Sequence, residues 1–344
     1  MSINPFFSII IPVYNTALYV GECLDSIKNQ TFQDWECICI DDGSKDNSLE
    51  ILEQYAAEDP RIKVFHQENQ GQSVARNLGL EKITGTYFTY VDSDDMLLSQ
   101  CLEQWYKRIK DSNCDVLLEY GKLYRFHDKK ELSAFQPSSN DNFFSFFTEK
   151  KAILDFLLIE QGIKGYTVCK IYSSEKLKHL RFDSSLSYAE DSTYYLNILR
   201  EDITIGAVES RNYAYRVDRP GSHSTTISSR EKVDYLYNSY QHLQLLEDFG
   251  FSESDQKECY QRHFASTMRY VMGAASECYN LLDKEYREKF RKTCLLIKKS
   301  TGCYPFNFFM YLRVEIFRGR LNRFVSLIEY LYYGIKKKIT KTRR

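Results

Sequence analysis

Acidic residues are concentrated at two points in the first hundred residues, each directly after a stretch of apolar residues. Asp41 and Asp42 follow the first stretch, and Asp92, Asp94 and Asp95 follow the second. Carboxylates gathered at one place repel one another unless a cation lies among them. Mg²⁺ and Mn²⁺ prefer such oxygen ligands and often bind together with a phosphate-bearing substrate. The alternative is that acidic residues follow strands simply because they favour turns.

The residues around these acids predict the elements that position them. Short apolar runs rich in β-branched residues alternate with stretches whose apolar residues recur at helical spacing. We expect strands over residues 7–13, 35–40, 62–66 and 87–91, and helices over 17–30, 47–57 and 73–83. This alternation is typical of right-handed βαβ units in a parallel sheet. Because ligands bind at the carboxyl edge of such a sheet, both acidic groups should meet there.

The pattern beyond residue 98 is less regular. A helix is expected over 98–110 and a strand over 115–120, followed by a helix over 152–159 and a strand over 213–217. Residues 125–149 are polar and are interpreted as an inserted loop, and beyond about residue 230 the spacing is continuously helical. We therefore expect an α/β domain over residues 1–225, with halves at 1–110 and 111–225, and a helical region over 226–344.

The composition is that of a globular protein of enzyme size. The 344 residues are 43% apolar, and 46 Lys and Arg against 47 Asp and Glu give a net charge of −1, which argues against a nucleic-acid binder. The ten cysteines are scattered without a C-x-x-C pair, so neither a zinc finger nor a disulfide framework is indicated. No signal-peptide pattern opens the chain, and no apolar run is long enough to span a membrane. These features favour a reduced, cytosolic protein.

Ordered motifs over residues 6–110 resemble the nucleotide-sugar-binding half of the family 2 glycosyltransferases. The matching segments are S-I-I-I-P-V-Y-N at 8–15, Q-T-F at 30–32, D-D-G-S-x-D at 41–46, N-Q-G at 69–71, A-R-N-x-G at 75–79 and the Asp-x-Asp at 92–94. No G-x-G-x-x-G motif follows the first strand, which excludes a dinucleotide-dependent dehydrogenase. The resemblance implies the GT-A fold, a mainly parallel sheet flanked by helices with a helical C-terminal region, and transfer of a sugar from a nucleotide donor.

The resemblance implies roles for the residues that would bind the nucleoside. Tyr14 would offer its ring to the nucleobase, Asp42 would accept the imide N–H of uracil, and Asp41 would shape that pocket or the ribose site. Three further residues are assigned to the same nucleotide-sugar site: Pro12, Asn15 and Ser93.

A second set of residues would bind the diphosphate. Arg76 would neutralise phosphate charge, with a structural ion pair as the alternative. Asp92 would lie near the ribose and the metal, and Asp94 would bind the Mn²⁺ or Mg²⁺ that bridges the diphosphate. Asp95 would orient its neighbours.

The resemblance continues beyond residue 160 in two segments. V-C-K-I-Y at 168–172 resembles the N-K-L-(F/Y) segment of the family, with Cys169 where Asn is usual and Lys170 as a contact to acceptor or phosphate. Glu190 and Asp191 resemble its E-D pair, in which the Asp is the general base that an inverting transfer needs. Glu190 would orient the acceptor. The alternative is that two acids at a helix start only complement the helix dipole.

A third segment, Y-x-Y-R followed by R-P-G-S-H, resembles the part of the family that closes over the donor. Arg216 and Arg219 would meet the diphosphate. His223 would complete the metal site in its neutral form, and a histidine without a metal is the alternative.

Charge is distributed unevenly along the chain. Residues 306–344 carry a net charge of +8, and the preceding residues carry −9. Apolar residues between 317 and 335 recur on one helical face, and a Lys- and Arg-rich tail follows. A basic amphipathic helix of this kind is typical of proteins that bind an anionic membrane surface. Docking of the helix on the protein's own core is the alternative.

The sequence thus predicts a metal-dependent inverting glycosyltransferase that moves a sugar from a nucleotide-sugar, with uridine expected, to a glycan or lipid-linked acceptor. We expect it at the inner face of the cytoplasmic membrane, with homo-oligomers possible and no nucleic-acid partner. A nucleotidyltransferase on a similar fold would need a basic loop after the first strand, and residues 15–27 contain no Lys or Arg. A non-catalytic sugar-nucleotide-binding or scaffold protein is the other alternative, and the intact Asp94 and Asp191 argue against it.

Overall fold

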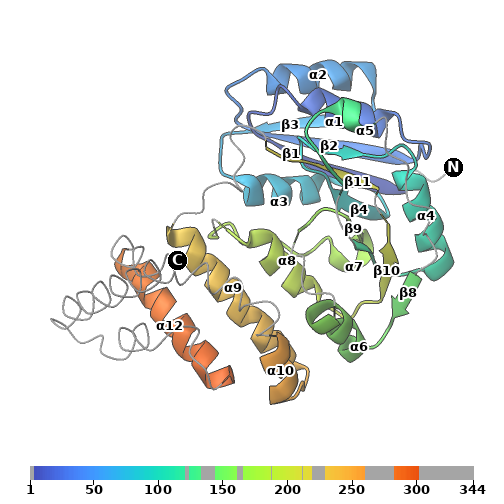
Figure 1. Cartoon of the computed structure of the whole chain (residues 1–344). Coiled ribbons are helices and arrows are strands. Elements are labelled where there is room, and N and C mark those ends of the chain that lie inside the picture. The colour runs from blue at the N-terminus through green and yellow to red at the C-terminus, as the bar shows by residue number, and fades with distance from the viewer. Residues whose placement is uncertain are drawn as a thin grey trace, which may run out of the picture. The chain divides into compact units, whose positions relative to one another are not determined.

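The computed structural model describes residues 4–120, 124–132, 144–160, 166–186, 188–210, 212–218, 229–259 and 283–301 (Figure 1). The chain divides into two compact units, Met1–Thr226 and Ile227–Arg344. An eight-stranded sheet forms the centre of the first unit, and the described residues of the second unit form helices.

The large sheet is mainly parallel. Its strands are β1 (Phe7–Val13), β2 (Trp35–Asp42), β3 (Ile62–Gln67), β4 (Tyr87–Tyr90), β6 (Val116–Tyr120), β8 (Phe144–Phe147), β9 (Lys170–Ser173) and β10 (Ile205–Glu209). They lie in the order β3-β2-β1-β4-β9-β6-β10-β8, and only β9 and β8 run against the others. The predicted strands in residues 7–91 are confirmed to within two residues at each end.

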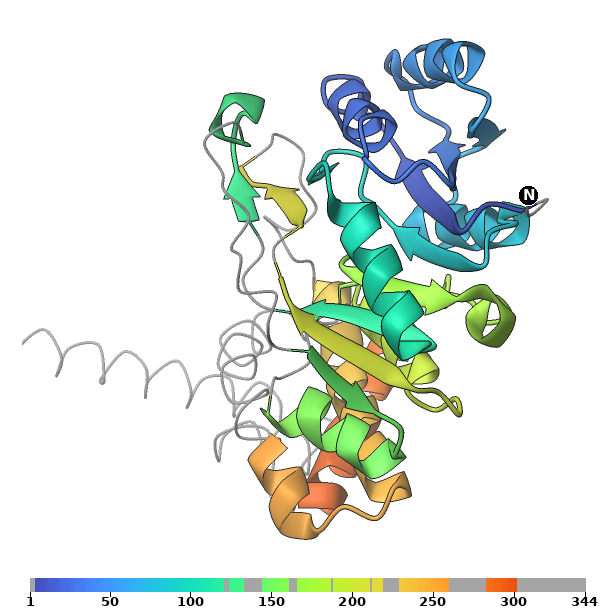
Figure 2. The ribbon, with the colours of Figure 1, turned by 90° about the vertical axis from the view of Figure 1, so that its right-hand side faces the viewer.

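A second sheet contains three short strands in the order β5-β11-β7: β5 (Met96–Leu97), β11 (Tyr213–Arg216) and β7 (Tyr124–Phe126). Figure 2 shows β7 and β11 side by side, apart from the large sheet. The expectation of an irregular loop over residues 125–149 was wrong for the described part of this range. That part contains the end of β7, the helix α5 (Lys129–Leu132) and the strand β8. β7 pairs with β11 and β8 pairs with β10, and both partners lie far away in the sequence.

Helices cover both faces of the large sheet. α1 (Val20–Lys28) and α2 (Ser48–Glu58) lie on one face, and α3 (Gln72–Lys82) and α8 (Glu190–Ile198) lie on the other (Figure 1). α4 (Cys101–Ser112) contributes to the same core as α1 and α2. Two short helices, α6 (Lys150–Leu154) with its π-helical continuation Asp155–Glu160, and α7 (Ser174–Leu177), complete the described helices of this unit.

Alternate side chains of β1 pack against opposite helical layers. Phe7, Ile9 and Ile11 belong to the core that includes α1, α2 and α4. Ile10 faces α3, where Gly79 allows a close approach: a Cβ at position 79 would lie 2.4 Å from Cγ2 of Ile10. β1 is therefore buried on both faces, as expected for a strand in the middle of a sheet covered by helices.

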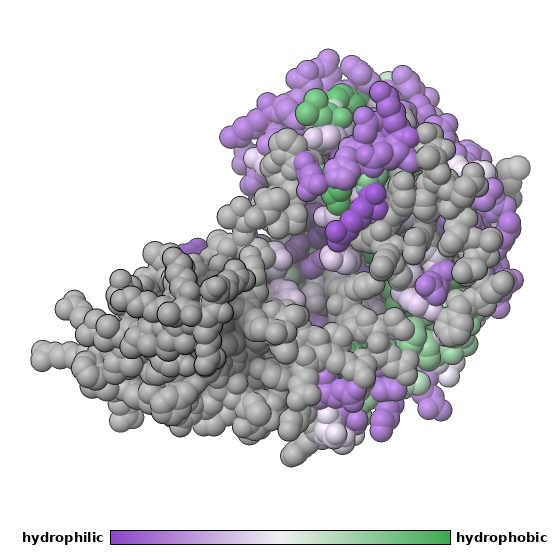
Figure 3. All heavy atoms as spheres, in the orientation of Figure 1, coloured by the Kyte–Doolittle hydropathy of each residue, from purple (hydrophilic) through white to green (hydrophobic). Residues whose placement is uncertain are grey.

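Six of the ten cysteines have side chains that the structure describes as free thiols, and all six are buried: Cys23, Cys37, Cys39, Cys101, Cys114 and Cys169. This confirms for these six the prediction of core cysteines. Most of the described surface is hydrophilic in the view of Figure 3, with small apolar patches.

The second unit contains α9 (Ser229–Asp248), α10 (Glu253–Cys259) and α12 (Lys284–Thr301). α9 and α12 are joined by an ion pair between Lys289 and the fully buried Asp234, with 2.8 Å between Nζ and Oδ1. None of the helices that the structure describes is long and apolar enough to cross a membrane. The predicted amphipathic tail, residues 317–344, lies outside the described residues.

Candidate active site at the edge of the large sheet

The ends of β1, β2 and β4 meet at one edge of the large sheet. Val13 lies opposite Asp41 in the parallel pair of β1 and β2, and Ile10 lies opposite Tyr90 in the parallel pair of β1 and β4. The residues that follow these strands therefore share this edge, as the parallel pairing requires. Both acidic groups of the first hundred residues are among them.

The segment after β1 is fastened to the segment after β2. Asn15, at a φ of 52°, accepts a hydrogen bond from the Lys45 amide at 2.7 Å, and its own amide donates to Oγ of Ser44 at 3.0 Å. The amide of Ala17 donates to Asp46 at 3.0 Å. These contacts leave the Tyr14 side chain 41% exposed at the edge of the sheet. Asn15 thus shapes the backbone, and Tyr14 offers an accessible ring.

Asp41 and Asp42 are both buried and bind the protein itself. Oδ2 of Asp41 lies 2.8 Å from Nδ1 of His66. Asp42 accepts hydrogen bonds from the side chain of Gln67 at 2.7 Å and from the amides of Gln70 and Gly71, each at 2.9 Å. The Asp42 carboxylate therefore fixes the loop between β3 and α3. Pro12 is buried within β1, opposite Ile40.

The Asp-x-Asp segment divides into accessible and buried residues. Asp92 and Asp94 are partly exposed, whereas Ser93 and Asp95 are buried. Burial, followed by the charges of Asp92 and Asp94, raises the pKa of Asp95 well above its usual range. In the part of the chain that the structure describes, no three His, Cys, Asp or Glu side chains are grouped closely enough to hold a metal ion.

The strand β11 holds the Asp-x-Asp segment through Tyr213, the first residue of the Y-x-Y-R segment, to which the sequence analysis gave no role of its own. The Tyr213 hydroxyl donates to Oδ2 of Asp95 at 2.7 Å and accepts from the amide of Asp92 at 3.2 Å. Tyr213 is 1% exposed and Asp95 is 0% exposed, so both hydrogen bonds are shielded from water. Their positions in the sequence, 118 residues apart, gave no signal of this contact.

Arg216, at the other end of β11, is enclosed by protein acceptors. Its Nε donates to the carbonyl of Asp94 at 2.9 Å, and its guanidinium also contacts the carbonyl of His127 and, at 2.6 Å, the carboxylate of Glu22. Its own amide donates to Asp95 at 2.8 Å. Arg216 is 6% exposed. The geometry favours a positioning role for Arg216 over the expected contact with the diphosphate.

Arg76 connects the Asp-x-Asp segment with the start of α8. One guanidinium nitrogen lies 3.3 Å from Asp92 Oδ1, and another lies 3.2 Å from Glu190 Oε1. Arg76 is 3% exposed and packs on the ring of Phe182. The structure thus shows the ion pairs that were the alternative for Arg76. It also brings the two predicted acidic groups, which are about a hundred residues apart, to either side of one cation.

Asp191 lies beside this cation at the first turn of α8. Burial, and next the charge of Glu190, raises the pKa of Asp191 to about 7, although Arg76, the amide of Ser192 and Lys170 act in the opposite direction. Asp191 as a whole residue is partly exposed. α8 begins after Ala189, whose φ of 60° is unusual for a residue other than glycine.

Lys170 lies at the start of β9 and is 2% exposed. Its Nζ donates to the carbonyl of Tyr166 and lies 4.8 Å from the centre of the Tyr195 ring. The neighbouring Cys169 has a φ of 61°, a conformation that Asn adopts more readily than Cys. This gives a physical reason why Asn is expected at position 169. Arg219 and His223 lie outside the described residues.

The mixed sheet and its acidic edge define the GT-A class of fold. The structure of residues 1–349 of TarS from Staphylococcus aureus, in complex with UDP-GlcNAc, matches this chain with a TM-score of 0.63 and 21% identity, covering 94% of this chain and 89% of that one. At this identity the likeness shows the fold alone. It confirms the expected fold class.

Sequence comparison identifies the family. The glycosyl transferase family 2 model matches residues 8–153. EpsJ of Bacillus subtilis, an uncharacterized glycosyltransferase, is 32% identical over 242 residues, which cover 69% of this chain and 68% of EpsJ. The glycosyltransferase GlyA of Streptococcus pneumoniae is 31% identical over 259 residues, which cover 73% of this chain but only 36% of GlyA. The chain belongs to glycosyltransferase family 2, as the motifs predict.

Proposed function

We propose that this chain transfers a sugar from a UDP-sugar to a hydroxyl group of a glycan or lipid-linked acceptor, with inversion at the anomeric carbon. The observation that carries the proposal is the position of Arg76 between Asp92 and Glu190. This cation joins the Asp-x-Asp segment at the strand edge to the acidic pair at the start of α8. A donor bound at the strand edge would then present its anomeric carbon toward Asp191.

Asp191 is proposed as the general base. In the transfer, the acceptor oxygen forms a bond to the anomeric carbon, the bond from that carbon to the diphosphate breaks, and UDP leaves with the electron pair. The acceptor hydroxyl must lose its proton, and Asp191 takes it. A base works best when its pKa is near the pH of the reaction, and the pKa of Asp191, about 7, meets this condition.

The chemistry of the Asp-x-Asp segment fits a divalent cation. Asp92 and Asp94 offer accessible carboxylate oxygens, and Mg²⁺ is usually bound by one or two carboxylates together with substrate phosphates. We propose that Asp94, with Asp92 beside it, would hold Mn²⁺ or Mg²⁺. The bound cation would supply positive charge that stabilises the leaving diphosphate. Asp95, Tyr213 and Arg216 keep the segment in position for this task.

The donor site is proposed at the ends of β1 and β2. Tyr14 is the exposed aromatic residue there, and a nucleobase has a planar face that can stack on its ring. Asp42 fixes the loop at residues 67–71 and would meet the uracil imide beside it. UDP is proposed because the TarS structure that shares this fold contains UDP-GlcNAc. Pro12, Asn15 and Ser93 shape the same edge.

We propose that the chain acts at the cytoplasmic face of a membrane. The proposal rests on the +8 charge of residues 306–344 and on the apolar face of the segment before the tail. Deleting residues 317–344 should release the protein from anionic vesicles of phosphatidylglycerol in a flotation experiment. Equal flotation of the shortened chain would favour docking of this segment on the protein.

The proposed activity can be tested with the purified full chain. UDP-GlcNAc, UDP-glucose and UDP-galactose are each incubated with the protein and Mn²⁺, and the release of UDP is measured with and without EDTA. Slow hydrolysis of at least one donor is expected because water can replace the acceptor, and EDTA should abolish it. Full turnover in EDTA would overturn the metal proposal. Failure of all UDP-sugars to bind or react would overturn the choice of donor.

A further inference from the structure

Glu22, on α1, is the acidic partner of Arg216, and the proposed transfer gives it no role. Its Oε2 lies 2.6 Å from a terminal guanidinium nitrogen of Arg216. The two side chains differ in exposure: that of Glu22 is 35% exposed, and that of Arg216 is 5% exposed. An ion pair between two exposed residues contributes little to stability, but loss of Glu22 would leave a buried cation without its partner carboxylate. The pair is therefore more than a surface contact.

The Arg216 guanidinium has a defined orientation. Its other hydrogen bonds that the structure describes go to two backbone carbonyl groups: Nε donates to that of Asp94 at 2.9 Å, and a terminal nitrogen donates to that of His127 at 3.2 Å. The centres of the Tyr19 and Phe126 rings lie 4.9 and 4.5 Å from its Cζ. Neither a carbonyl group nor a ring carries a formal charge. Among these contacts, the counter-charge for the cation comes from α1.

α1 also contacts the residues that follow β4 directly. The Cys23 thiol lies 3.6 Å from the carbonyl oxygen of Asp92, and the Ser26 hydroxyl accepts a hydrogen bond from the amide of Leu97 at 3.1 Å. Glu22, Cys23 and Ser26 lie on one face of α1, because positions three and four apart are neighbours on a helix surface. This face thus holds the chain from the Asp-x-Asp segment to β5 in place.

We propose that Glu22 is a positioning residue for the divalent-cation site. It orients the Arg216 guanidinium so that Nε stays on the carbonyl of Asp94, which fixes the backbone that carries the proposed cation ligand. Its negative charge also neutralises Arg216, so a bound cation would not face an uncompensated positive charge nearby. The part of this inference that concerns the cation rests on the proposed function, and the part that concerns the segment does not.

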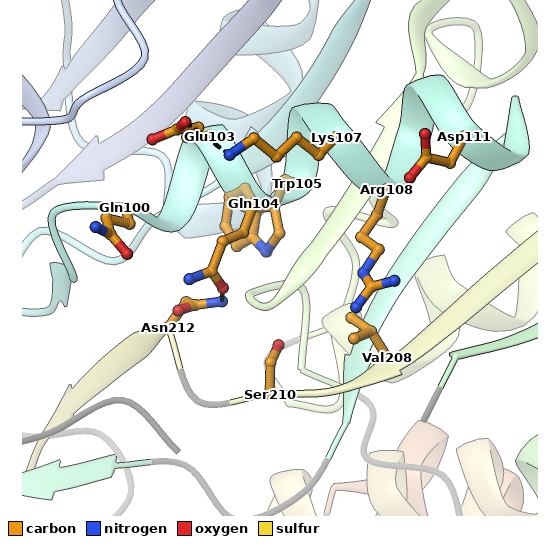
Figure 4. A pocket seen from close by; sticks show the side chains of 10 residues that line it. All are labelled: Gln100, Glu103, Gln104, Trp105, Lys107, Arg108, Asp111, Val208, Ser210 and Asn212. Atoms are coloured by element: carbon orange, nitrogen blue, oxygen red, sulfur yellow. Dashed lines mark hydrogen bonds and ion pairs between the residues drawn. The ribbon is translucent and has the colours of Figure 1, made fainter. Parts of the chain in front are cut away.

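The other end of β11 supplies a matched control. Asn212, directly before this strand, donates from its side chain to Oε1 of Gln104 at 2.8 Å and to Glu119 at 3.4 Å. Figure 4 shows the Asn212 and Gln104 side chains pointing toward each other, in a pocket lined by α4 and by residues around the connection between β10 and β11. Gln104 is a partly exposed helical residue, like Glu22. Its contact with Asn212 involves no residue of the Asp-x-Asp segment.

The first measurement is amide hydrogen exchange of the full chain without ligand, read on peptides that span the Asp-x-Asp segment and β5. The amides of Asp92, Asp95 and Leu97 are hydrogen-bonded, so their exchange reports on opening of this part of the chain. Glu22→Gln should speed exchange there about tenfold, because the buried guanidinium loses its counter-charge. Glu22→Asp, which keeps the charge, should restore part of the protection, and Gln104→Ala should leave it unchanged.

The second measurement is a calorimetric titration of Mn²⁺ in the presence of UDP. The dissociation constant of Mn²⁺ should rise about tenfold in Glu22→Gln, by less in Glu22→Asp, and not at all in Gln104→Ala. Gln104→Ala also removes a hydrogen bond of the fold, so the comparison separates positioning of the segment from a general loss of stability.

Three outcomes would overturn the inference: unchanged exchange in Glu22→Gln, equal changes in Glu22→Gln and Gln104→Ala, or faster exchange in Glu22→Gln with unchanged Mn²⁺ affinity. If the wild type binds no Mn²⁺ while Glu22→Gln still speeds exchange, the cation site of the proposed function fails and the positioning of the segment by Glu22 stands. The two failures are therefore distinguishable.

Discussion

Asp95 and Asp191 both have a pKa that burial raises, but their surroundings differ. Asp95 is fully buried, and its two oxygens accept hydrogen bonds from the Tyr213 hydroxyl and the Arg216 amide. Asp191 is partly accessible, and the amide of the adjacent Ser192 donates to it at 2.7 Å. The first carboxylate is occupied in holding a loop. The second belongs to a partly exposed residue and is the proposed general base.

The comparison of Asp95 with Asp191 separates a carboxylate with a structural role from one with a proposed catalytic role. A raised pKa alone does not identify a catalytic acid or base, because structural networks perturb pKa values as well. Accessibility and the neighbouring charges make the distinction here. The groups that act on Asp191 come from several elements: Glu190 on α8, Arg76 on α3 and Lys170 on β9. On β9, burial raises the pKa of Tyr172, and the charge of Asp191 raises it further.

The largest effect is expected from Asp191→Asn. The amide cannot accept the acceptor proton, so the transfer rate should fall about a thousandfold, while the dissociation constant for the UDP-sugar stays within about twofold. Asp202→Asn, an exposed Asp in the connection between α8 and β10, is the matched control and should keep the full rate. A nearly normal rate for Asp191→Asn would remove the distinction between the two carboxylates.

Arg76→Gln should have the next largest effect. It removes the cation between Asp92 and Glu190 and one of the charges that lower the pKa of Asp191. The rate at pH 7 should fall about tenfold or more, and the rise of activity with pH should move to higher pH.

Two variants serve as comparisons for this prediction. Arg76→Lys keeps the charge and should restore part of the rate. Arg61→Lys, in which a remote ion pair with Asp59 is altered, should leave the pH profile in place. An unmoved profile in Arg76→Gln would show that Arg76 has no influence on Asp191.

Tyr213→Phe tests the hydrogen bonds that hold Asp95 and the Asp-x-Asp segment in position. The change leaves Oδ2 of Asp95 and the amide of Asp92 without their buried partner, which should lower the free energy of unfolding by about 1–3 kcal/mol. Because the Asp-x-Asp segment loses its support, the Mn²⁺ concentration for half-maximal binding, measured calorimetrically with UDP present, should rise.

Tyr55→Phe provides the control for this stability effect. The Tyr55 hydroxyl donates to Asp25 at 2.8 Å and contacts the carbonyl of Gly21, and both of these partners lie on α1 and not in the Asp-x-Asp segment. This variant should lose stability without any change in Mn²⁺ binding. Equal Mn²⁺ binding by Tyr213→Phe and the wild type would limit Tyr213 to a structural role.

The smallest effect is expected on the pH dependence of the free energy of unfolding, compared between the wild type and Asp191→Asn. The pKa of Asp191 is about 7 in the folded chain, against 3.8 as the ordinary value, so the folded state binds the proton more tightly. The stability that this provides is complete below about pH 4 and is lost as the pH rises through 7. Asp191→Asn avoids this loss. It should be more stable than the wild type by about 1–2 kcal/mol at pH 8 and by less at pH 5.5, measured by urea unfolding.

The strands and helices of the first hundred residues could be predicted well from sequence because their pattern is local. Strands and helices between Phe7 and Lys82 have clear periodicity, and their parallel pairing places Asp41 and Asp92 at one edge without further information. The short strands β5, β7 and β11 could not be predicted as a sheet, since each has two to four residues and its partners are distant.

The sequence named the candidate site residues but could not predict which residues contact one another. Asp191 was assigned by resemblance and the Asp-x-Asp segment by its residue types and by resemblance, and both assignments stay predictions. The hydrogen bonds of Tyr213 and the enclosure of Arg216 depend on tertiary packing. Arg76 was expected on phosphate, and in the structure it pairs with carboxylates on both sides. Buried ion pairs of this kind leave no pattern of spacing in the sequence.

The most direct test of the central claim is the pH dependence of kcat/KM for sugar transfer by the full chain between pH 5.5 and 8.5. With Asp191 as the base, log kcat/KM should rise with unit slope at low pH and level off near pH 7, the pKa of Asp191. The residual activity of Asp191→Asn should lack this limb. A wild-type profile that is flat across the range, or a limb that persists in Asp191→Asn, would contradict the assignment.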